Sequence, residues 1–113
     1  MMKAADLPPQ PVVSAIIVNW NTRNHLKVCL DSLLADGGSR DLEVIVVDNN
    51  SADGSADMVQ QEYPAASLVR SPRNLMFAGG VNKGLECARG EYLLILNPDI
   101  RSEERRVGKE CRL

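Results

Sequence analysis

Three short apolar runs, each ending on an amide or a carboxylate, constrain this chain more than any other feature. They are AIIVN, which ends at Asn19, VIVVD, which ends at Asp48, and LLILNPD, which contains Asn97 and Asp99. Residues 93–96 are too uniformly apolar for a half-exposed strand and predict one that is buried on both faces. In an open α/β sheet the carboxyl ends of the strands face the ligand. We therefore expect a ligand site made from the polar residues that follow these runs.

The apolar runs alternate with amphipathic stretches, a pattern typical of βα units in a parallel sheet. The expected elements are a strand over 12–19, a helix from a cap at Asn21 or Thr22 to Gly37-Gly38, a strand over 42–48, a short helix capped by Ser51 or Asp53 and reaching about Glu62, a strand over 67–70, a helix with Phe77, Val81, Leu85 and Ala88 on one face, and a strand over 91–96. Four such strands with right-handed crossovers most commonly take the order 3-2-1-4. The predicted fold class is α/β, with three layers and a mostly parallel sheet.

The expected third helix contains the paired glycines Gly79 and Gly80 near its start. Each costs about 1 kcal/mol relative to alanine in a helix interior. Another interaction should compensate for this cost, and the close approach of the backbone to a ligand is a candidate.

The two ends of the chain differ from its body. Residues 1–11 are rich in proline, and we expect a flexible arm there. Residues 101–113, RSEERRVGKECRL, carry 8 charges in 13 positions without helical or strand periodicity. They are interpreted as a disordered tail or as non-native sequence appended where a longer reading frame was cut, and we favour the second. The interpretable domain is then 12–100, and it stops in mid-fold.

Composition excludes several classes of function. The net charge is −2 overall and −4 over residues 1–100, so no basic surface indicates nucleic-acid binding. The three cysteines have no short paired spacing, which argues against a disulfide framework and a zinc site. No stretch approaches the roughly 18 apolar residues of a membrane span, and the first residues lack an apolar signal core. We expect a cytoplasmic protein, with peripheral attachment at the inner membrane face as a variant.

The polar residues at the expected strand ends suit a nucleotide and a metal. Asn19, Asn21, Asp48, Asn97 and Asp99 would converge in the crevice between the first and fourth strands. Asp48 can accept a hydrogen bond from a nucleobase imide or a ribose hydroxyl. Asp99 can ligate Mg²⁺ or Mn²⁺, a cation that would offset charge developing on a diphosphate leaving group.

Each of these motifs also has a purely structural interpretation. Residues 48–51 are common turn formers and can be only a turn with a helix cap. Asn97-Pro98-Asp99 can be an ordinary turn, and Asn74 and Asn82 can be solvated positions around the third helix. Trp20 can stack on a base or simply pack.

Three blocks, SAIIVNWNTRNHLKVCLDSLL, EVIVVDNNSADGS and RNLMFAGGVNKGLECARGEYLLILNPD, together resemble the amino-terminal half of the family 2 inverting glycosyltransferases. The resemblance covers residues 12–100 and implies a partial GT-A, Rossmann-like fold. It implies transfer of a sugar from a nucleotide diphosphate to a glycan or lipid-linked acceptor hydroxyl, with inversion. It assigns the nucleotide to Asn19, Asn21, Asp48, Asn74, Asn82 and Asn97, and the metal, Mg²⁺ or Mn²⁺, to Asp99.

The sequence departs from the family's DxD metal motif because Asn97 stands at the first acidic position. An amide keeps an acceptor oxygen but lacks the charge, which leaves Asp99 as the expected metal ligand. The NPD variant resembles that of rhamnosyltransferase-like members, which suggests a dTDP-sugar or UDP-sugar donor. In this family the general base lies in the second half of the domain, so we assign no catalytic base within this chain and expect little or no transfer activity from it alone.

Two other classes of function remain as alternatives. A dinucleotide-binding module would need a G-x-G-x-x-G turn after the first strand, and the turn here, NWNTR, has no glycine. A non-catalytic interaction domain on the same scaffold, with oligomers pairing through an open sheet edge, is the stronger alternative.

Overall fold

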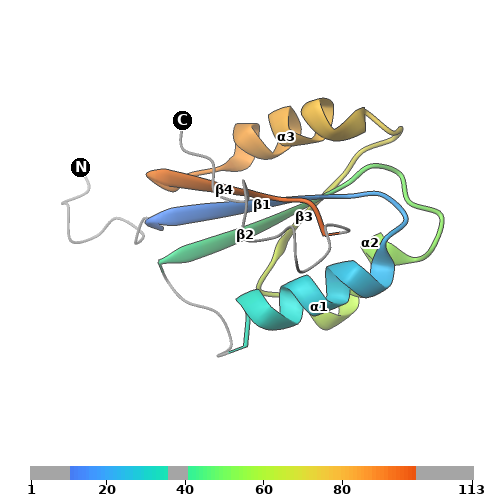
Figure 1. The fold of residues 1–113 in the computed structure, drawn as a ribbon, viewed down its shortest axis with the longest axis horizontal. Coiled ribbons are helices and arrows are strands. Elements are labelled where there is room, and N and C mark those ends of the chain that lie inside the picture. Colours follow the sequence, from blue (N-terminus) through green and yellow to red (C-terminus); the bar gives the residue numbers. More distant parts are fainter. Residues whose placement is uncertain (1–10, 36–40, 99–113) are drawn as a thin grey trace, which may run out of the picture.

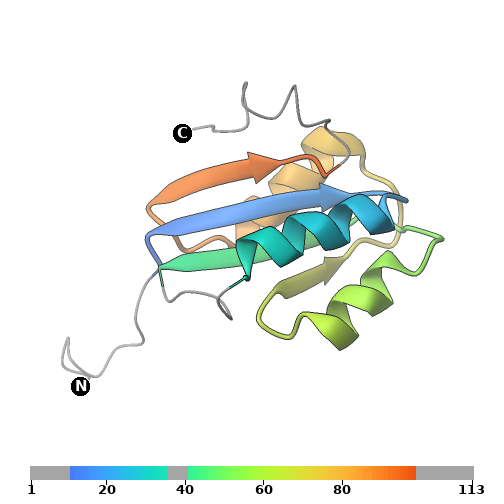
Figure 2. The same ribbon diagram turned by 60° about the horizontal axis from the view of Figure 1, so that its bottom comes forward.

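The computed structural model describes residues 11–35 and 41–98, which form a single sheet between two helical layers (Figure 1). The elements are β1 (Val13–Asn19), α1 (Arg23–Leu33), β2 (Leu42–Asp48), α2 (Ser55–Glu62), β3 (Ser67–Arg70), α3 (Met76–Cys87) and β4 (Tyr92–Leu96). Helix α3 covers one face of the sheet, and α1 and α2 cover the other (Figures 1 and 2). The predicted α/β class and its three layers are confirmed.

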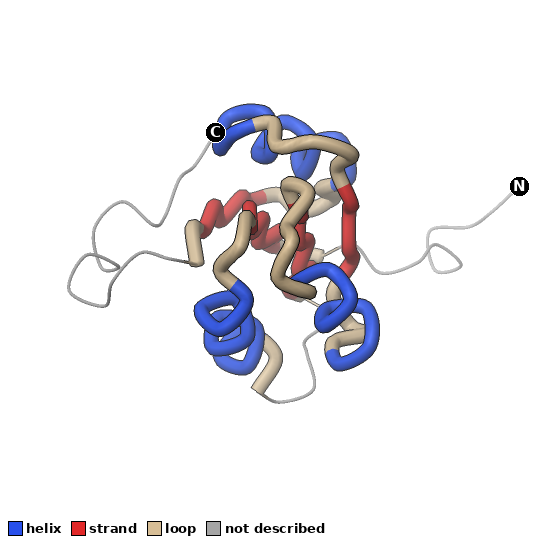
Figure 3. The backbone as a smooth tube through the Cα atoms, turned by 90° about the vertical axis from the view of Figure 1, so that its right-hand side faces the viewer, coloured by secondary structure: helices blue, strands red, loops and turns tan. Residues whose placement is uncertain are grey.

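The sheet has the order β3-β2-β1-β4, and every neighbouring pair of strands is parallel. The predicted order 3-2-1-4 is therefore confirmed. In the β1–β2 register Asn19 lies opposite Asp48, so two of the predicted site residues end neighbouring strands side by side. Figure 3 looks onto this end of the sheet, where the loops that follow the strands lie together.

The central strands β1 and β2 are buried on both faces, as their apolar runs predict. On the α1 and α2 side the core contains Ile17, Val46, Leu26, Leu30 and Val59. On the α3 side Ile16, Val18, Ile45 and Val47 form a second buried cluster. Alternate residues of β1 and β2 thus point into two separate cores, and this places the residues at the strand ends in fixed positions.

The prediction that residues 93–96 are buried on both faces is wrong. Tyr92 is exposed, and Leu93 to Leu96 are only half-buried. The reason is topological, because β4 is an edge strand of the described sheet and pairs with β1 on one side.

The glycines of α3 are explained by packing rather than by a ligand. A Cβ on Gly80 would lie 2.5 Å from Val18 Cγ1, and one on Gly84 would lie 2.5 Å from Ile16 Cγ2. Both glycines are buried against β1. A Cβ on Gly79 would instead meet Leu75 Cβ at 2.6 Å. Close helix-to-strand contact at Gly80 and Gly84 therefore compensates for the low helix propensity that the sequence shows.

The helix boundaries differ from the prediction at the end of α1 and at the start of α2. Helix α1 ends at Leu33, short of the expected end at 37–38. Thr22 does take the position before α1, but its side chain makes no capping hydrogen bond to the helix. Gly54, at φ 84°, is the residue before α2 in place of Ser51 or Asp53. No described helix is long and apolar enough to cross a membrane.

Candidate functional site

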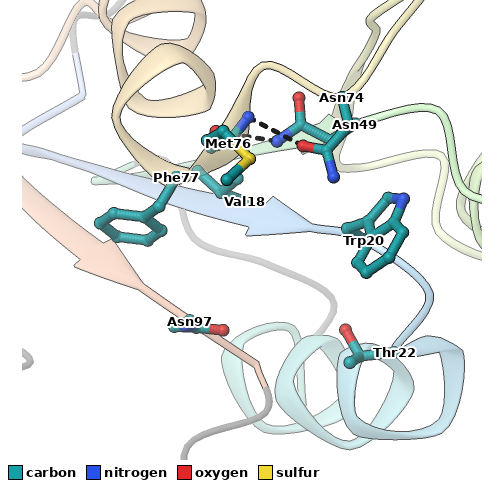
Figure 4. A pocket seen from close by; sticks show the side chains of 8 residues that line it. All are labelled: Val18, Trp20, Thr22, Asn49, Asn74, Met76, Phe77 and Asn97. Atoms are coloured by element: carbon teal, nitrogen blue, oxygen red, sulfur yellow. Dashed lines mark hydrogen bonds between the residues drawn. The ribbon is translucent and has the colours of Figure 1, made fainter.

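A pocket of about 400 Å³ opens at the carboxyl end of the sheet. Figure 4 shows its eight lining residues, which are Val18, Trp20, Thr22, Asn49, Asn74, Met76, Phe77 and Asn97. They come from the end of β1, the turn between β1 and α1, the loop after β2, the segment that begins α3, and the residue after β4. The pocket therefore lies at the switch point between β1 and β4, where the sequence predicts a ligand.

Beside the pocket, Asn19 and Asp48 are joined by a direct hydrogen bond. Asn19 Nδ2 donates to Asp48 Oδ1 at 3.0 Å, and Asp48 Oδ2 accepts the backbone N–H of Ser51 at 2.9 Å. Asn19 is fully buried and Asp48 is only 3% exposed. The pair thus ties the ends of β1 and β2 to the loop that follows β2.

The turn after β1 is held by one contact of its own and by two contacts to the loop after β2. Thr22 Oγ1 donates to Asn19 Oδ1 at 2.6 Å. Asn21 has a positive φ of 54°, its N–H donates to Ser51 Oγ, and its Oδ1 accepts the Ala52 N–H at 2.7 Å. These contacts fix the segment that carries Trp20, which is 52% exposed and lines the pocket.

The opposite wall of the pocket depends on two asparagines. Asn49 is 1% exposed, accepts the Leu75 N–H at 3.3 Å and donates through Nδ2 to the Met76 carbonyl at 3.0 Å. Asn74 Oδ1 accepts the Met76 N–H at 2.8 Å. Between them Met76 adopts φ 64°, a conformation that is rare for a residue other than glycine. Figure 4 shows the two hydrogen bonds of Met76, to Asn49 and to Asn74, as dashed lines.

The predicted site residues fall into three groups. Asn74 and Asn97 line the pocket. Asn19 and Asp48 are buried at the strand ends next to it, and Asn21 is used in the loop contacts described above. Asn82 is exposed on α3 and is not among the described residues that line the pocket. Asp99, the predicted metal ligand, lies outside the described residues.

Sequence reasoning missed four of the lining residues as site candidates, namely Thr22, Asn49, Met76 and Phe77. Asn49 directly follows Asp48, and its burial distinguishes it from an ordinary turn residue. Met76 and Phe77 are exposed apolar residues at the start of α3. The signal available in the sequence was an apolar pair shortly after Asn74. The helical periodicity instead predicted that Phe77 faces the core.

The described lining of the pocket has no ionisable side chain. Its polar groups are amides and a hydroxyl, and its apolar groups include the rings of Trp20 and Phe77. Among the described residues no group of three or more His, Cys, Asp and Glu could hold a metal ion. The described part of the pocket therefore suits a flat, uncharged group with several hydrogen-bonding edges.

One carboxylate near the pocket has a shifted pKa, Asp53. Burial raises the pKa of this carboxyl, but hydrogen bonds from the Ser55 hydroxyl and from the N–H groups of Arg23 and Ser55 outweigh burial, so its pKa is lowered. Asp53 thus stays charged and links the first residue of α1 to the first residue of α2. Its role here is to hold the loops around the site.

Comparison with known sequences identifies the family. The model of the family described as "Glycosyl transferase family 2" matches residues 14–109. The chain belongs to glycosyltransferase family 2. It is 31% identical over 104 residues to a protein of Bacillus subtilis (strain 168) named "Putative teichuronic acid biosynthesis glycosyltransferase TuaG", and this match covers 89% of the chain and 41% of TuaG.

Solved structures of glycosyltransferases share the fold. The mannosyltransferase PcManGT from Pyrobaculum calidifontis, in complex with GDP-Man and Mn²⁺, matches 80% of the chain with a TM-score of 0.69 and 30% identity. S. aureus TarS 1–349, in complex with UDP-GlcNAc, matches 78% of the chain with a TM-score of 0.68 and 27% identity. The predicted GT-A, Rossmann-like fold is therefore confirmed.

The chain spans only part of these relatives. It covers 41% of TuaG, 28% of the PcManGT chain and 26% of the TarS chain. Residues 14–109, which the family model matches, include the pocket residues and the carboxyl ends of β1 to β4.

Proposed function

We propose that this chain is the donor-binding part of an inverting glycosyltransferase, which transfers a sugar from a nucleoside diphosphate to an acceptor hydroxyl. The observation that carries the proposal is the pocket at the β1–β4 switch point, lined by Trp20, Phe77 and three asparagine side chains. Membership of family 2 supports the reaction class. The complexes of PcManGT with GDP-Man and of TarS with UDP-GlcNAc support a nucleotide sugar as the ligand.

The chemistry of the lining supports binding of the nucleoside rather than of the diphosphate in this pocket. Base rings stack on aromatic faces, and the exposed ring of Trp20 offers one. The amides of Asn74 and Asn97 provide both donors and acceptors for the polar edges of a base and a ribose. Because the described lining is neutral, it gives no electrostatic attraction to phosphate, which would lie at its edge.

Asn19, Asn21, Asp48 and Asn82 stay in the proposal as predicted nucleotide contacts. Each oxygen of Asp48 accepts one hydrogen bond in the structure and keeps a second lone pair, so a base N–H can still be accepted there. For Asn82 the support is the family resemblance alone. The donor classes predicted from the NPD sequence, dTDP-sugars and UDP-sugars, likewise remain predictions.

The predicted metal site is consistent with the described residues. Mg²⁺ and Mn²⁺ at such sites take few protein carboxylates and complete their shells with phosphate oxygens and water. In the sequence Asp99 follows the pocket residue Asn97 by two positions, which supports the proposed metal ligand. A bound cation would offset the negative charge that develops on the leaving diphosphate.

Transfer itself needs a general base, which typically contributes about 10²–10⁴-fold. The described lining of the pocket contains no carboxylate or histidine that could take this role. That the base, and the site for a glycan or lipid-linked acceptor, lie in protein beyond this chain remains a prediction from the family resemblance. The cytoplasmic location, with peripheral attachment at the inner membrane face, remains a prediction.

Calorimetric titration with UDP, dTDP and GDP, each with and without Mn²⁺, tests the proposal. We expect saturable binding of UDP or dTDP that is stronger with Mn²⁺, and loss of the Mn²⁺ effect in Asp99→Ala. Glu86→Ala, at an exposed carboxylate on α3, is the matched control and should behave as the unsubstituted chain. Absence of binding by all three nucleotides would contradict the donor-binding role, and an unchanged Mn²⁺ effect in Asp99→Ala would contradict the metal assignment.

The alternative, an interaction domain that forms oligomers through an open sheet edge, is favoured by one observation. Strand β4 lies at the edge of the described sheet, and Tyr92 on it is 51% exposed. An unpaired edge can add a strand from another chain. Sedimentation of the chain over a range of concentrations separates the two proposals. The alternative predicts that the chain self-associates, that Leu94→Lys abolishes this self-association, and that the chain binds no nucleotide.

A further inference from the structure

We infer that Asn49 is a positioning residue that sets the shape of the nucleotide pocket by holding Met76 in a left-handed backbone conformation. The inference rests on the proposed function for the identity of the ligand. It concerns a residue that the sequence did not single out, and it assigns Asn49 a task distinct from contact with the nucleotide.

The side chain of Asn49 holds the start of α3 by two hydrogen bonds. Its side chain is almost fully buried, and both of its polar atoms bond to the backbone of one turn, at the Leu75 N–H and the Met76 carbonyl. Leu75 and Met76 are 26 and 27 residues further along the chain. Asn49 therefore joins the end of β2 to the start of α3, the helix that covers the face of the sheet away from α1 and α2.

Met76 is the residue whose backbone conformation depends on these hydrogen bonds. At φ 64° its Cβ is in an unfavourable position relative to the backbone, as for any residue other than glycine. Its side chain is 71% exposed, so burial of the methionine does not hold the conformation. The hydrogen bonds from Asn49 and to Asn74 are the described interactions that stabilise it.

The conformation of Met76 determines where the next side chain points. Met76 and Phe77 both line the pocket, opposite the segment that carries Trp20 (Figure 4). If Met76 relaxed to the right-handed region, the chain would enter α3 in a different direction and both side chains would leave their places in the wall. Asn49 thus acts on ligand binding through Met76 and Phe77.

Close packing around Asn49 limits what can replace it. A Cβ on Gly80 would lie 3.2 Å from Asn49 Nδ2, so the first turns of α3 leave little space around the amide. Aspartate has nearly the same shape but offers an oxygen to the Met76 carbonyl, where Asn49 offers an N–H. Asn49→Asp therefore tests the hydrogen bond, and Asn49→Ala tests the whole side chain.

A double-substitution cycle with Met76→Gly tests the inference, because glycine adopts positive φ without strain. In the chain without nucleotide, the three-bond HN–Hα coupling and the Cα chemical shift of Met76 report its φ. We expect both to indicate positive φ in the unsubstituted chain and to change in Asn49→Ala and Asn49→Asp. Asn24→Ala, at an exposed amide on α1 outside this pocket, should leave them unchanged.

The second readout is affinity for the nucleotide that binds in the titrations above, measured below the unfolding transition of every variant. We expect Asn49→Ala to weaken binding about tenfold, and to weaken it less than twofold further when introduced into Met76→Gly. An equal loss in both backgrounds would overturn the inference, as would a Met76 that keeps positive φ in Asn49→Ala. If the unsubstituted chain binds no nucleotide, the proposed function fails, while the NMR parameters of Met76 still decide the role of Asn49.

Discussion

Asn19 donates a hydrogen bond to Asp48 across the carboxyl ends of two neighbouring parallel strands, with 3.0 Å between Nδ2 and Oδ1. The two residues also lie opposite each other in the register of β1 and β2. A buried amide and a buried carboxylate at this position are stable only because each satisfies the other and the loop after β2. The polar strand ends in the sequence thus have a structural task as well as the proposed binding task.

Asp48→Asn should lower the free energy of unfolding by about 1–3 kcal/mol, the usual cost of leaving a buried polar group without its partner. The amide that replaces the carboxylate offers one acceptor where two donors, Asn19 Nδ2 and the Ser51 N–H, now point. Urea unfolding measures the change. Asp57→Asn at an exposed carboxylate is the matched control, and an equal, small effect of both substitutions would contradict the role of the buried pair.

Gly84→Ala should destabilise the fold although alanine is the better helix former. The propensity gain is about 1 kcal/mol, whereas overpacking of a close contact costs about 1–3 kcal/mol. The added Cβ would lie 2.5 Å from Ile16 Cγ2 on β1. Thermal unfolding of Gly84→Ala and of the exposed control Glu86→Ala checks this, and a more stable Gly84→Ala would show that α3 does not pack on β1 as described.

The acid stability of the chain should depend on Glu43. Burial raises the pKa of this carboxyl, but hydrogen bonds from the Arg89 N–H, the Ser14 hydroxyl and the Arg89 guanidinium outweigh burial and lower the pKa. Stability from a lowered pKa is present above the ordinary value of 4.5 and is lost as the pH falls through that value toward the folded-state pKa. Glu43→Gln should therefore flatten the fall in unfolding free energy below pH 4.5.

Urea unfolding at several pH values measures this slope, with Glu86→Gln on α3 as the control that should keep it. A slope unchanged by Glu43→Gln would mean that the contacts to Ser14 and Arg89 do not favour the charged carboxylate. These contacts lie at the start of β4, where Gly90 N–H also donates to Ser14 Oγ.

The sequence predicts the elements and their order well because the apolar runs of β1 and β2 match their burial. It fails at β4, since a run of leucines looks the same whether one or both faces are covered, and only the position of a strand in the sheet decides this. It also offered a ligand as a candidate reason for Gly79 and Gly80, because the contact between Gly80 and Val18 joins residues far apart in the chain.

The candidate site was predicted only in part, because some of its residues have a local sequence signal and others are defined by contacts with distant residues. Polar residues at strand ends, such as Asn97, are visible in the sequence because they interrupt an apolar run. Asn49 stands in a run of turn-forming residues, and nothing local shows that its side chain is buried and bonded to Leu75 and Met76. Positive φ at Met76 is equally hidden, because methionine gives no sign of it.

Asn74→Ala should weaken nucleotide binding about tenfold while lowering stability little, since Asn74 is exposed and lines the pocket. Its Oδ1 also accepts the Met76 N–H, so part of the loss comes from the pocket wall. Calorimetry measures the affinity and thermal unfolding the stability. Gln61→Ala at an exposed amide on α2 is the control, and equal affinity in both variants would exclude Asn74 from the site.

The central claim is that a nucleoside occupies the pocket between Trp20 and Asn97, and NMR of the Trp20 indole N–H during titration with UDP tests it most directly. Trp20 is the only tryptophan in the chain, so its resonance is unambiguous. We predict a saturable shift of this resonance and of the Asn74 and Asn97 side-chain amides, with the Gln61 amide unchanged. Binding of UDP that leaves Trp20, Asn74 and Asn97 unshifted would contradict the account, as would absence of binding by UDP, dTDP and GDP alike.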